Sequence, residues 1–278
     1  MPLSFSASDL DDLLAILIAA ADTEILPRFQ RLGDDDVGTK SGPMDLVTVA
    51  DRAAEAAIAA AVATRFPAAA FVGEESVAED PTRLGLLANA DLAVVVDPID
   101  GTFNFASGLP LFGVMAAVVA GGETIAGIIL DPLTGSHMTA LKGEGARLGF
   151  RDGRPARPLR VAAAEPVGDM HGCVSWSYMP GSLRDTVATR MARLAATYNY
   201  RCAAHEYRLA ATGACHVLAY GKLMPWDHLA GCLIHAEAGG FSAKFDGSPY
   251  RPTDTGGGLL LAPDAASWEA LREALIGG

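Results

Sequence analysis

The sequence predicts an α/β protein in which helices and sheets form layers. An all-apolar run over residues 92–96 predicts a strand that is buried on both faces. Two further apolar runs, 111–119 and 124–130, are joined by a stretch with glycines at 121–122, which is typical of a hairpin. After residue 160, short apolar runs alternate with segments of helical periodicity, as in other α/β proteins.

Length and composition restrict the class of protein. The 278 residues can form one large domain or two of ordinary size, and 50% of them are apolar. The net charge of −12 argues against a surface for nucleic acid or an anionic membrane, and no apolar run is long enough to span a bilayer. The four cysteines form no Cys-x-x-Cys pair and no secretion signal precedes them, so we expect buried thiols and a cytoplasmic location.

The amino-terminal half is predicted to alternate helices with strands. Apolar side chains at helical spacing predict a helix over residues 8–31, with Ser8 as its cap. An alanine-rich helix begins near Asp51, and a short strand over 69–72 follows it. Residues 136–140 are predicted to continue the antiparallel layer that the hairpin begins.

The carboxyl-terminal half follows a polar, basic and proline-containing stretch at residues 151–160. We therefore predict two domains, residues 1–155 and residues 156–278. The second domain is predicted to be an α/β layer in which strands and helices alternate. Strands are expected at 173–176, 198–202, 217–220, 241–245 and 259–262, and helices at 183–196, 206–212, 225–238 and 267–276.

The strand over 92–96 runs into a pair of carboxylates, and this stretch is the centre of the predicted site. Pro98 lacks an N–H and fixes φ, so we expect the strand to end there. Gly101 can adopt backbone angles that other residues avoid. Asp97 and Asp100 are therefore predicted to lie on a turn at the carboxyl end of the strand, where open α/β sheets bind ligands.

Two carboxylates this close repel each other unless a cation lies between them. Mg²⁺ prefers oxygen ligands and is often held by a few carboxylates together with a substrate phosphate. The amides of Gly101 and Thr102 could also bind an anion if a helix begins there. The run alone leaves two interpretations open: a metal and phosphate site, or an Asp-Pro turn in which Asp100 caps a short helix.

Three other acidic residues are open to two interpretations on local grounds. Asp51 lies near the start of its helix, where a cap or a partner of the helix dipole is the commoner role. Glu74 and Glu75 follow a strand and a glycine, where a solvated turn is favoured over a pair of ligands. Two candidate motifs are rejected, because the loop over 33–42 and the run over 143–149 lack the spacing of phosphate-binding and dinucleotide-binding motifs.

Three separated motifs combine into a family pattern. They are Gly73-Glu74-Glu75, Asp97-Pro-Ile-Asp-Gly-Thr102 and Trp226-Asp227-x-x-Ala230-Gly231. Together they resemble the inositol monophosphatase family of Mg²⁺-dependent, lithium-sensitive phosphatases, and Lys40 and the run Asp45-Leu-Val-Thr-x-x-Asp51 match as well. The resemblance covers nearly the whole chain. It implies an αβαβα sandwich of the inositol monophosphatase and fructose-1,6-bisphosphatase type, commonly assembled as a homodimer.

The resemblance implies a metal site built from carboxylates. Two or three Mg²⁺ ions are expected, with Mn²⁺ as a substitute and Li⁺ or Ca²⁺ as inhibitors. The first ion would be held by Glu74, Asp97 and the carbonyl of Ile99. The second would be held by Asp97, Asp100 and Asp227, and a weaker third would be reached through water by Glu75.

The resemblance also implies catalytic and substrate contacts. Asp51 and Thr102 would orient and help to activate the attacking water, and Glu74 is grouped with them as catalytic. The amides of Gly101 and Thr102 would meet the phosphate, and Lys40 would lie on the loop that closes over the metals. The remaining residues expected to face the substrate are Asp100, Asp227, Ala203 and Tyr220.

The substrate-facing residues depart in part from the family pattern. Inositol-specific members have an acidic residue where this chain has Tyr220, and a tyrosine cannot accept a diol in the bidentate manner of a carboxylate. Ala203 matches the small residue that lines the substrate pocket of the family. The run His205-Glu206-Tyr207-Arg208 is left with three roles: a substrate contact, an interface or a buried ion network.

The predicted function is Mg²⁺-dependent hydrolysis of a small phosphate monoester by direct attack of metal-activated water, without a phosphoenzyme. Inositol 1-phosphate is the first candidate substrate. Histidinol phosphate is the alternative, followed by a nucleotide 3′-phosphate or a sugar bisphosphate. A hypothesis from another class is a non-catalytic regulatory protein that binds a macromolecular partner through this scaffold. Nucleic acid and membrane are not expected as partners.

Overall fold

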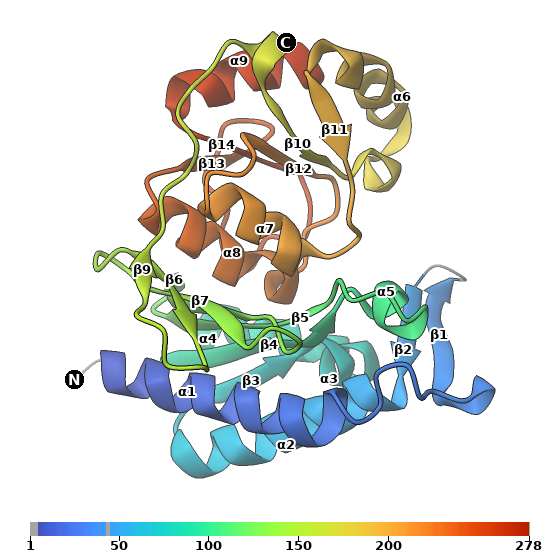
Figure 1. Ribbon diagram of the computed structural model, residues 1–278, viewed down its shortest axis with the longest axis vertical. Helices are drawn as coiled ribbons and strands as arrows, with labels where there is room; N and C mark the ends of the chain where they lie inside the picture. Colours follow the sequence, from blue (N-terminus) through green and yellow to red (C-terminus); the bar gives the residue numbers. More distant parts are fainter. Residues whose placement is uncertain (1–4, 43–44, 278) are drawn as a thin grey trace.

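The computed structural model describes residues 5–42 and 45–277. Its helices and sheets form five layers, which Figure 1 shows from bottom to top. The layers are helices α1 (Ala7–Ala20) and α2 (Val49–Arg65), a seven-stranded sheet, helices α7 (Ala203–Ala211) and α8 (Pro225–Glu237), a five-stranded sheet, and helices α6 (Gly181–Arg190) and α9 (Ala265–Leu275). This order confirms the α/β class and the αβαβα sandwich.

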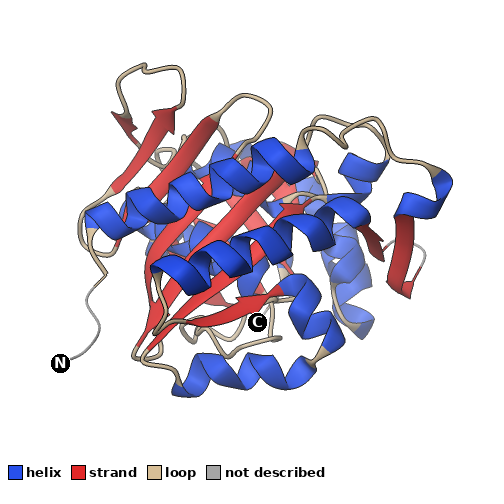
Figure 2. Cartoon of the chain, turned by 90° about the horizontal axis from the view of Figure 1, so that it is seen from below, coloured by secondary structure: helices blue, strands red, loops and turns tan. Residues whose placement is uncertain are grey.

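The seven-stranded sheet contains the strand that carries the predicted site. In spatial order its strands are β3 (Ala70–Gly73), β4 (Leu92–Asp100), β5 (Gly113–Ala120), β6 (Glu123–Leu130), β7 (Ser136–Leu141), β8 (Ala146–Phe150) and β9 (Arg157–Pro158). β3 and β4 are parallel, and all later neighbours are antiparallel. The predicted hairpin is therefore confirmed as β5 and β6. The two long helices α1 and α2 lie across one face of this sheet (Figure 2).

The five-stranded sheet lies on the other side of helices α7 and α8 from the seven-stranded sheet (Figure 1). In spatial order its strands are β11 (Ala196–Tyr198), β10 (His171–Val174), β12 (Val217–Tyr220), β14 (Leu259–Ala262) and β13 (Phe241–Lys244). β10 is parallel to both β11 and β12, and the remaining pairs are antiparallel. Parallel neighbours end at the same edge of a sheet, so β10, β11 and β12 all direct their following loops to one side.

The smaller elements surround the first sheet and connect the layers. A separate antiparallel hairpin is formed by β1 (Val37–Gly42) and β2 (Asp45–Thr48). The short α-helices are α3 (Glu74–Glu79), α4 (Leu86–Asn89) and α5 (Thr102–Ala106). Single 3₁₀ turns lie at Asp34–Asp36, Pro81–Gly85, Val167–Asp169, Trp176–Tyr178 and Met191–Arg193.

Three apolar clusters fill the spaces between the layers, and β4 contributes to two of them. Val94 and Val96 pack with Leu17 of α1 on one face, whereas Val95 packs with Tyr207 of α7 on the other. Successive strand residues point to opposite faces, so a strand covered on both sides needs apolar residues at every position. The third cluster lies between the five-stranded sheet and helices α6 and α9.

β4 does not end at Pro98, so the expected end of this strand is wrong. The strand runs to Asp100, and its register against β5 shifts between Asp97 and Asp100. The missing N–H of Pro98 therefore falls where the regular pattern of strand hydrogen bonds is already interrupted. Bulges of this kind accommodate proline, and they also redirect side chains near functional sites.

The first helix is shorter than predicted and is capped by a different serine. Ser6 forms the cap: the backbone N–H of Asp9 donates to its hydroxyl at 3.3 Å, and its own N–H donates to the Asp9 carboxylate at 2.9 Å. Ser8 and Ser6 each precede an acid by three residues, Asp11 or Asp9, so the capping pattern fits both. The regular α-helix gives way to a π-helical turn at Ala21–Ile25.

Several boundaries in the second half also differ from the predictions. The helix expected over 183–196 is α6 followed by a 3₁₀ turn, and α7 begins three residues before the expected position 206. β9 still pairs with β8, so the chain leaves the first sheet after residue 158. The division into two domains at residue 155 stays a prediction. Within the described ranges, none of the helices has both the length and the apolar character needed to cross a membrane.

Helix α8 lies directly on β6, and glycine permits this close approach. A Cβ at Gly127 would lie 2.8 Å from the carbonyl oxygen of Ala230, which is shorter than real contacts of this kind. On the other side of α8, a Cβ at Gly231 would overlap the ring of Tyr207 in α7. Because Asp227 is carried by α8, these two glycines fix how closely that carboxylate approaches β4.

We predict that Gly127→Ala destabilises the protein by about 1–3 kcal/mol, because the added methyl group pushes α8 away from the sheet. The midpoint of urea unfolding measures this effect. Gly168→Ala is the matched control, since a Cβ there meets nothing within 4 Å. Equal midpoints for the two variants would show that α8 can shift without cost.

Candidate functional site

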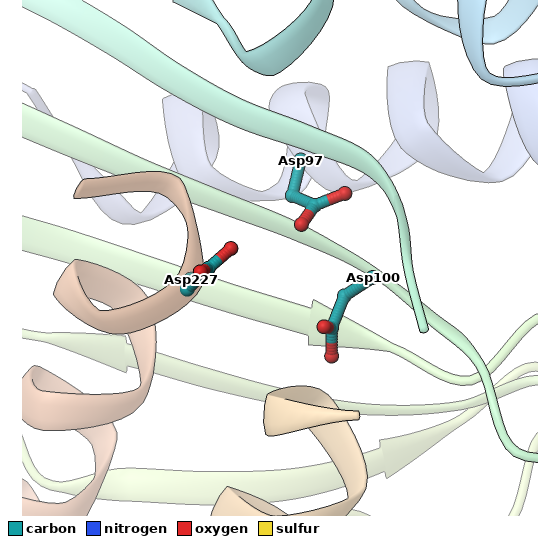
Figure 3. A group of neighbouring side chains, drawn as sticks. All are labelled: Asp97, Asp100 and Asp227. Atoms are coloured by element: carbon teal, nitrogen blue, oxygen red, sulfur yellow. The ribbon is translucent and has the colours of Figure 1, made fainter. Parts of the chain in front are cut away.

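Two strand residues and one helix residue bring three carboxylates together. Asp97 and Asp100 come from the end of β4, and Asp227 comes from the first turn of α8. One oxygen of each carboxylate lies within 4.8 Å of the others, and Figure 3 shows the three side chains as neighbours. Asp97 and Asp100 are buried, and Asp227 is half-buried. The carboxylate pair predicted from the motif is thus joined by the distant Asp227.

This cluster raises the pKa values of its own members. Burial is the largest cause for each, and the charges of Glu74 and Asp100 further raise the pKa of both Asp97 and Asp227 well above the usual range. The pKa of Asp100 rises only to about 6, because the N–H of Ala204 stabilises the charged form. Buried charges of one sign require protons or a cation between them. A set of oxygen donors fits a hard divalent cation such as Mg²⁺.

The backbone around the two strand aspartates is fixed locally. The N–H of Ile99 donates to Asp97 Oδ1 at 3.0 Å. Gly101 has a φ of 86°, and a Cβ there would lie 2.9 Å from the carbonyl oxygen of Leu111, so this position requires glycine. Helix α5 begins directly after Gly101, which is itself the cap residue. The alternative in which Asp100 caps this helix is therefore wrong.

Lys40 connects the β1–β2 hairpin to the start of α3. Its Nζ lies 2.8 Å from Glu74 Oε1 and 2.5 Å from Glu75 Oε1. Burial would lower the pKa of Lys40, but the two glutamates together raise it above its usual value. Burial raises the pKa of Glu75 to about 7, against the opposing effect of Lys40. Glu74 and Glu75 open a helix and share one cation, so the solvated turn favoured on local grounds is not what forms.

Asp51 forms the helix cap that was favoured on local grounds, and its second oxygen lies near Thr102. One oxygen, Oδ2, accepts hydrogen bonds from the N–H of Thr48 at 2.8 Å and from the Thr48 hydroxyl at 2.5 Å, which completes the amino-terminal cap of α2. The other oxygen, Oδ1, lies 3.0 Å from the Thr102 hydroxyl. The same hydroxyl lies 3.0 Å from the carbonyl of Ile99, and its single proton can serve only one of the two. Burial raises the pKa of Asp51 to about 6.

Sequence reasoning missed Glu55, which organises the start of α3. Glu55 is buried in α2, one turn after Asp51. Its Oε2 accepts from the N–H of Glu75 at 2.7 Å, and its Oε1 accepts from the N–H of Ser76 at 2.8 Å. A Cβ at Gly73 would overlap this carboxylate. The available signal was an acid four residues after Asp51, on the face of the helix that is otherwise apolar.

These residues surround a cavity of about 570 Å³ between the two halves of the chain. The predicted site residues that line the cavity are Glu74, Asp97, Ile99, Asp100, Gly101, Thr102, Ala203, Tyr220 and Asp227. Asp51 is connected to the cavity through Thr102, and Glu75 and Lys40 are connected to it through Glu74. One arrangement therefore brings together residues from motifs that lie far apart in the sequence.

The run His205-Glu206-Tyr207-Arg208 points mainly into the protein. Arg208 Nη1 lies 3.4 Å from Asp131 Oδ2, an ion pair that joins α7 to the turn between β6 and β7. Glu206 is 1% exposed, and its Oε1 accepts from the N–H of Tyr200 at 2.9 Å. Glu206 also lines the cavity. The run is thus an internal network with one member in the cavity wall.

These features define a layered α/β protein with a buried carboxylate cluster suited to divalent cations, in a cavity between its two sheets. The model of the inositol monophosphatase family matches residues 9–276. The chain belongs to the inositol monophosphatase family, as the sequence motifs predicted.

Individual relatives agree with this assignment. The Nus factor SuhB of Vibrio cholerae serotype O1 is 33% identical over 221 residues, which is 75% of either chain. The Nus factor SuhB of Haemophilus influenzae is 29% identical over 268 residues, or 94% of either chain. The crystal structure of SuhB from Bartonella henselae has a TM-score of 0.80 at 27% identity, covering 98% of this chain and 100% of that one. An IMPase from Thermotoga maritima shares the fold, with a TM-score of 0.78 at 23% identity over 96% and 98%.

We predict that Glu55→Gln weakens Mg²⁺ binding by about 10- to 100-fold, the usual effect of losing a residue that supports metal ligands. A glutamine offers one acceptor and one amide group, so one of the two N–H groups of α3 would face a donor. Isothermal titration with Mg²⁺ measures the affinity. Glu79→Gln is the control, because Glu79 is exposed on the same helix. Equal affinities in both variants would contradict a supporting role for Glu55.

We also predict that Mg²⁺ raises the melting temperature of the wild type by about 5 °C at 100 times its dissociation constant. Asp227→Asn should reverse the order of stability. Without metal the variant should melt higher than the wild type, because one repelling carboxylate is removed. With Mg²⁺ it should melt lower, because a ligand is lost. Calorimetric scans at both conditions test this, and a variant that is less stable in both would contradict the repulsion.

Proposed function

We propose that this protein hydrolyses a small phosphate monoester in a Mg²⁺-dependent reaction. The observation that carries the proposal is the convergence of Asp97, Asp100 and Asp227 beside the amides of Gly101 and Thr102 in a single cavity. A surface of carboxylates repels a phosphate dianion unless cations reverse the local charge. The membership of the chain in a family of phosphatases supports the same reaction class.

The carboxylates supply the oxygen ligands that divalent cations need. We propose that Glu74, Asp97 and the Ile99 carbonyl hold one ion, that Asp97, Asp100 and Asp227 hold another, and that Glu75 supports a weaker third. When bound, such ions supply Lewis acidity: they neutralise the carboxylates, attract the phosphate and make water more acidic. Mn²⁺ is proposed as a substitute, and Li⁺ or Ca²⁺ as inhibitors.

The residues of the chain position the phosphate and move the proton. We propose that the Gly101 and Thr102 amides hold phosphate oxygens at the start of α5, because the amino terminus of a helix favours an anion. We propose that Asp51 and Thr102, whose Oδ1 and hydroxyl oxygen lie 3.0 Å apart, orient water, and that Asp51 accepts its proton. The pKa of Asp51, about 6, suits a group that accepts a proton near neutral pH.

A water molecule, and no side chain, is proposed to attack the phosphorus. The thiol of Cys202 lines the cavity, but it is buried and donates to Asp100 Oδ2 at 3.1 Å. Burial raises the pKa of this thiol well above its usual value, which disfavours the thiolate that a nucleophile requires. A phosphorylated protein trapped during turnover would contradict direct hydrolysis.

Inositol 1-phosphate remains the first candidate substrate, and histidinol phosphate is the alternative. Tyr220 and Ala203 both line the cavity, which supports the proposal that they face the leaving group. A cytoplasmic homodimer without nucleic acid or membrane partners remains part of the proposal. The second class of function, a regulatory scaffold, is favoured by one observation: the curated relatives include Nus factors.

We predict that purified protein releases phosphate from a monoester only when Mg²⁺ is present, and that Asp100→Asn lowers kcat by at least about 100-fold. Asparagine keeps the shape and an acceptor for the Ala204 N–H but removes a charged metal ligand. The panel comprises inositol 1-phosphate, histidinol phosphate, glycerol 2-phosphate and adenosine 3′,5′-bisphosphate. Asp246→Asn serves as the control, because that carboxylate is exposed and bonds only within its turn.

Two results would separate the competing functions. Mg²⁺-dependent release that is lost in Asp100→Asn and kept in Asp246→Asn would establish a phosphatase. No release from any compound with Mg²⁺ or Mn²⁺ would favour the regulatory scaffold, for which binding partners would then be sought. Full activity in Asp100→Asn would contradict the proposed second metal site.

A further inference from the structure

The cavity extends beyond the carboxylates to the edge of the five-stranded sheet. Ser175 follows β10, Asn199 follows β11 and Gly221 follows β12, and all three line the cavity. The carboxyl ends of parallel strands are where sheets of this type bind ligands. This second wall faces whatever part of the substrate lies beyond the phosphate, so its charges decide which leaving groups fit.

Arg201 is part of this second wall, and its backbone has an unusual conformation. Its φ is 53°, and among the described residues only Gln30 shares a positive φ without being glycine. Residues with a Cβ avoid this region unless surrounding contacts impose it. Here the N–H of Arg201 donates to Asn199 Oδ1 at 2.8 Å, and Asn199 Nδ2 donates to Ser175 Oγ at 3.2 Å.

Glu206 also stabilises the turn that contains Arg201. Its buried carboxylate accepts from the N–H of Tyr200, the residue before Arg201. Two side chains, those of Glu206 and Asn199, therefore hold a turn that its own sequence disfavours. Strain maintained in this way is concentrated at functional sites, where it fixes a side chain for a purpose.

The guanidinium of Arg201 stacks on the residue that follows the proposed phosphate-binding amides. Its central carbon lies 3.9 Å from the centre of the Phe103 ring, and Phe103 directly follows Thr102. The next residue, Cys202, donates to Asp100. An arginine stacked on an aromatic face keeps its N–H groups in the plane, where they can bind a carboxylate or phosphate in a bidentate manner.

The remaining charges of this wall favour an anion. Lys222 follows β12, is exposed and lines the cavity with Arg201. Tyr220 in this wall has an uncharged side chain, and the carboxylate of Glu206 already accepts a backbone hydrogen bond. Asp45, the first residue of β2, also lines the cavity and adds a negative charge there.

We propose that Arg201 determines selectivity and that the preferred substrate carries a second anionic group, a carboxylate or a phosphate, beyond the phosphate that faces Asp97 and Asp100. This inference rests on the proposed phosphatase activity, and it ranks a substrate with two anionic groups above inositol 1-phosphate, which carries only one. The second group would bind the guanidinium of Arg201, with Lys222 adding charge at the rim. The chemistry at the carboxylate cluster is unchanged by this addition.

The test compares two matched pairs of compounds. 2-Phosphoglycerate differs from glycerol 2-phosphate by a carboxylate, and fructose 1,6-bisphosphate differs from fructose 1-phosphate by a phosphate. We expect wild-type kcat/KM to be at least about tenfold higher for the anionic member of one pair, a typical effect of a hydrogen bond between charged groups. The pair that shows the preference identifies which anion is bound.

Variants of Arg201 make the test specific. Arg201→Gly suits the positive φ, so the variant should fold, and it removes the charge. The preference should disappear through a higher KM for the anionic member, and Arg201→Lys should retain part of it. Gln30→Gly is the matched control, because it relieves the other positive φ outside the cavity and should keep the full preference.

Each possible result of these experiments either supports or overturns the role proposed for Arg201. Equal kcat/KM within both pairs, or a preference that survives in Arg201→Gly, would overturn it. If no compound is hydrolysed, the proposed function fails, and titration calorimetry of the same four compounds with Ca²⁺ present decides the role of Arg201 separately. Tighter binding of an anionic member that is lost in Arg201→Gly would support the inference, and its absence would overturn it.

Discussion

The repulsion among Asp97, Asp100 and Asp227 is the constraint on which the rest of the site depends. The three carboxylates lie in a place where burial already opposes their charges. Left to themselves they would separate, so the surrounding structure must hold them. The bulge in β4 sets the two strand residues, and the glycines beneath and beside α8 set the third. The clustered carboxylates therefore destabilise the fold, and a bound cation would remove this repulsion.

The sequence predicted those features that are encoded by contiguous residues. The apolar run of β4, the hairpin β5–β6 and the role of Gly101 all follow from a few neighbouring residues. The motifs also predicted which acids would meet, because the family pattern relates segments that lie more than a hundred residues apart. What the sequence could not predict depends on partners: Pro98 remains in a strand because β5 tolerates a shifted register, and Ser6 caps α1 although Ser8 has the same pattern.

Glu55 and Arg201 escaped prediction for a related reason. The carboxylate of Glu55 acts on backbone amides twenty residues later, and no local pattern records such a contact. The conformation of Arg201 depends on Asn199 and Glu206, which hold its turn from two sides. Asp51 is a different case, because its role as a helix cap is confirmed while its catalytic role stays a prediction. One oxygen caps α2 and the other lies near the Thr102 hydroxyl, so the cap occupies only one of the two carboxylate oxygens.

The two walls of the cavity differ in how deeply they are embedded in the protein. The carboxylates belong to β4 and α8, which are packed between apolar layers, whereas the opposite wall consists of loops that follow three strand ends. Mutations in such loops are tolerated far better than mutations in packed layers. Relatives can therefore differ in these loops while keeping the packed carboxylate wall. Under the proposed function, an inhibitor that only mimics phosphate would bind such proteins alike, whereas a compound that extends to the strand ends could be made selective for one.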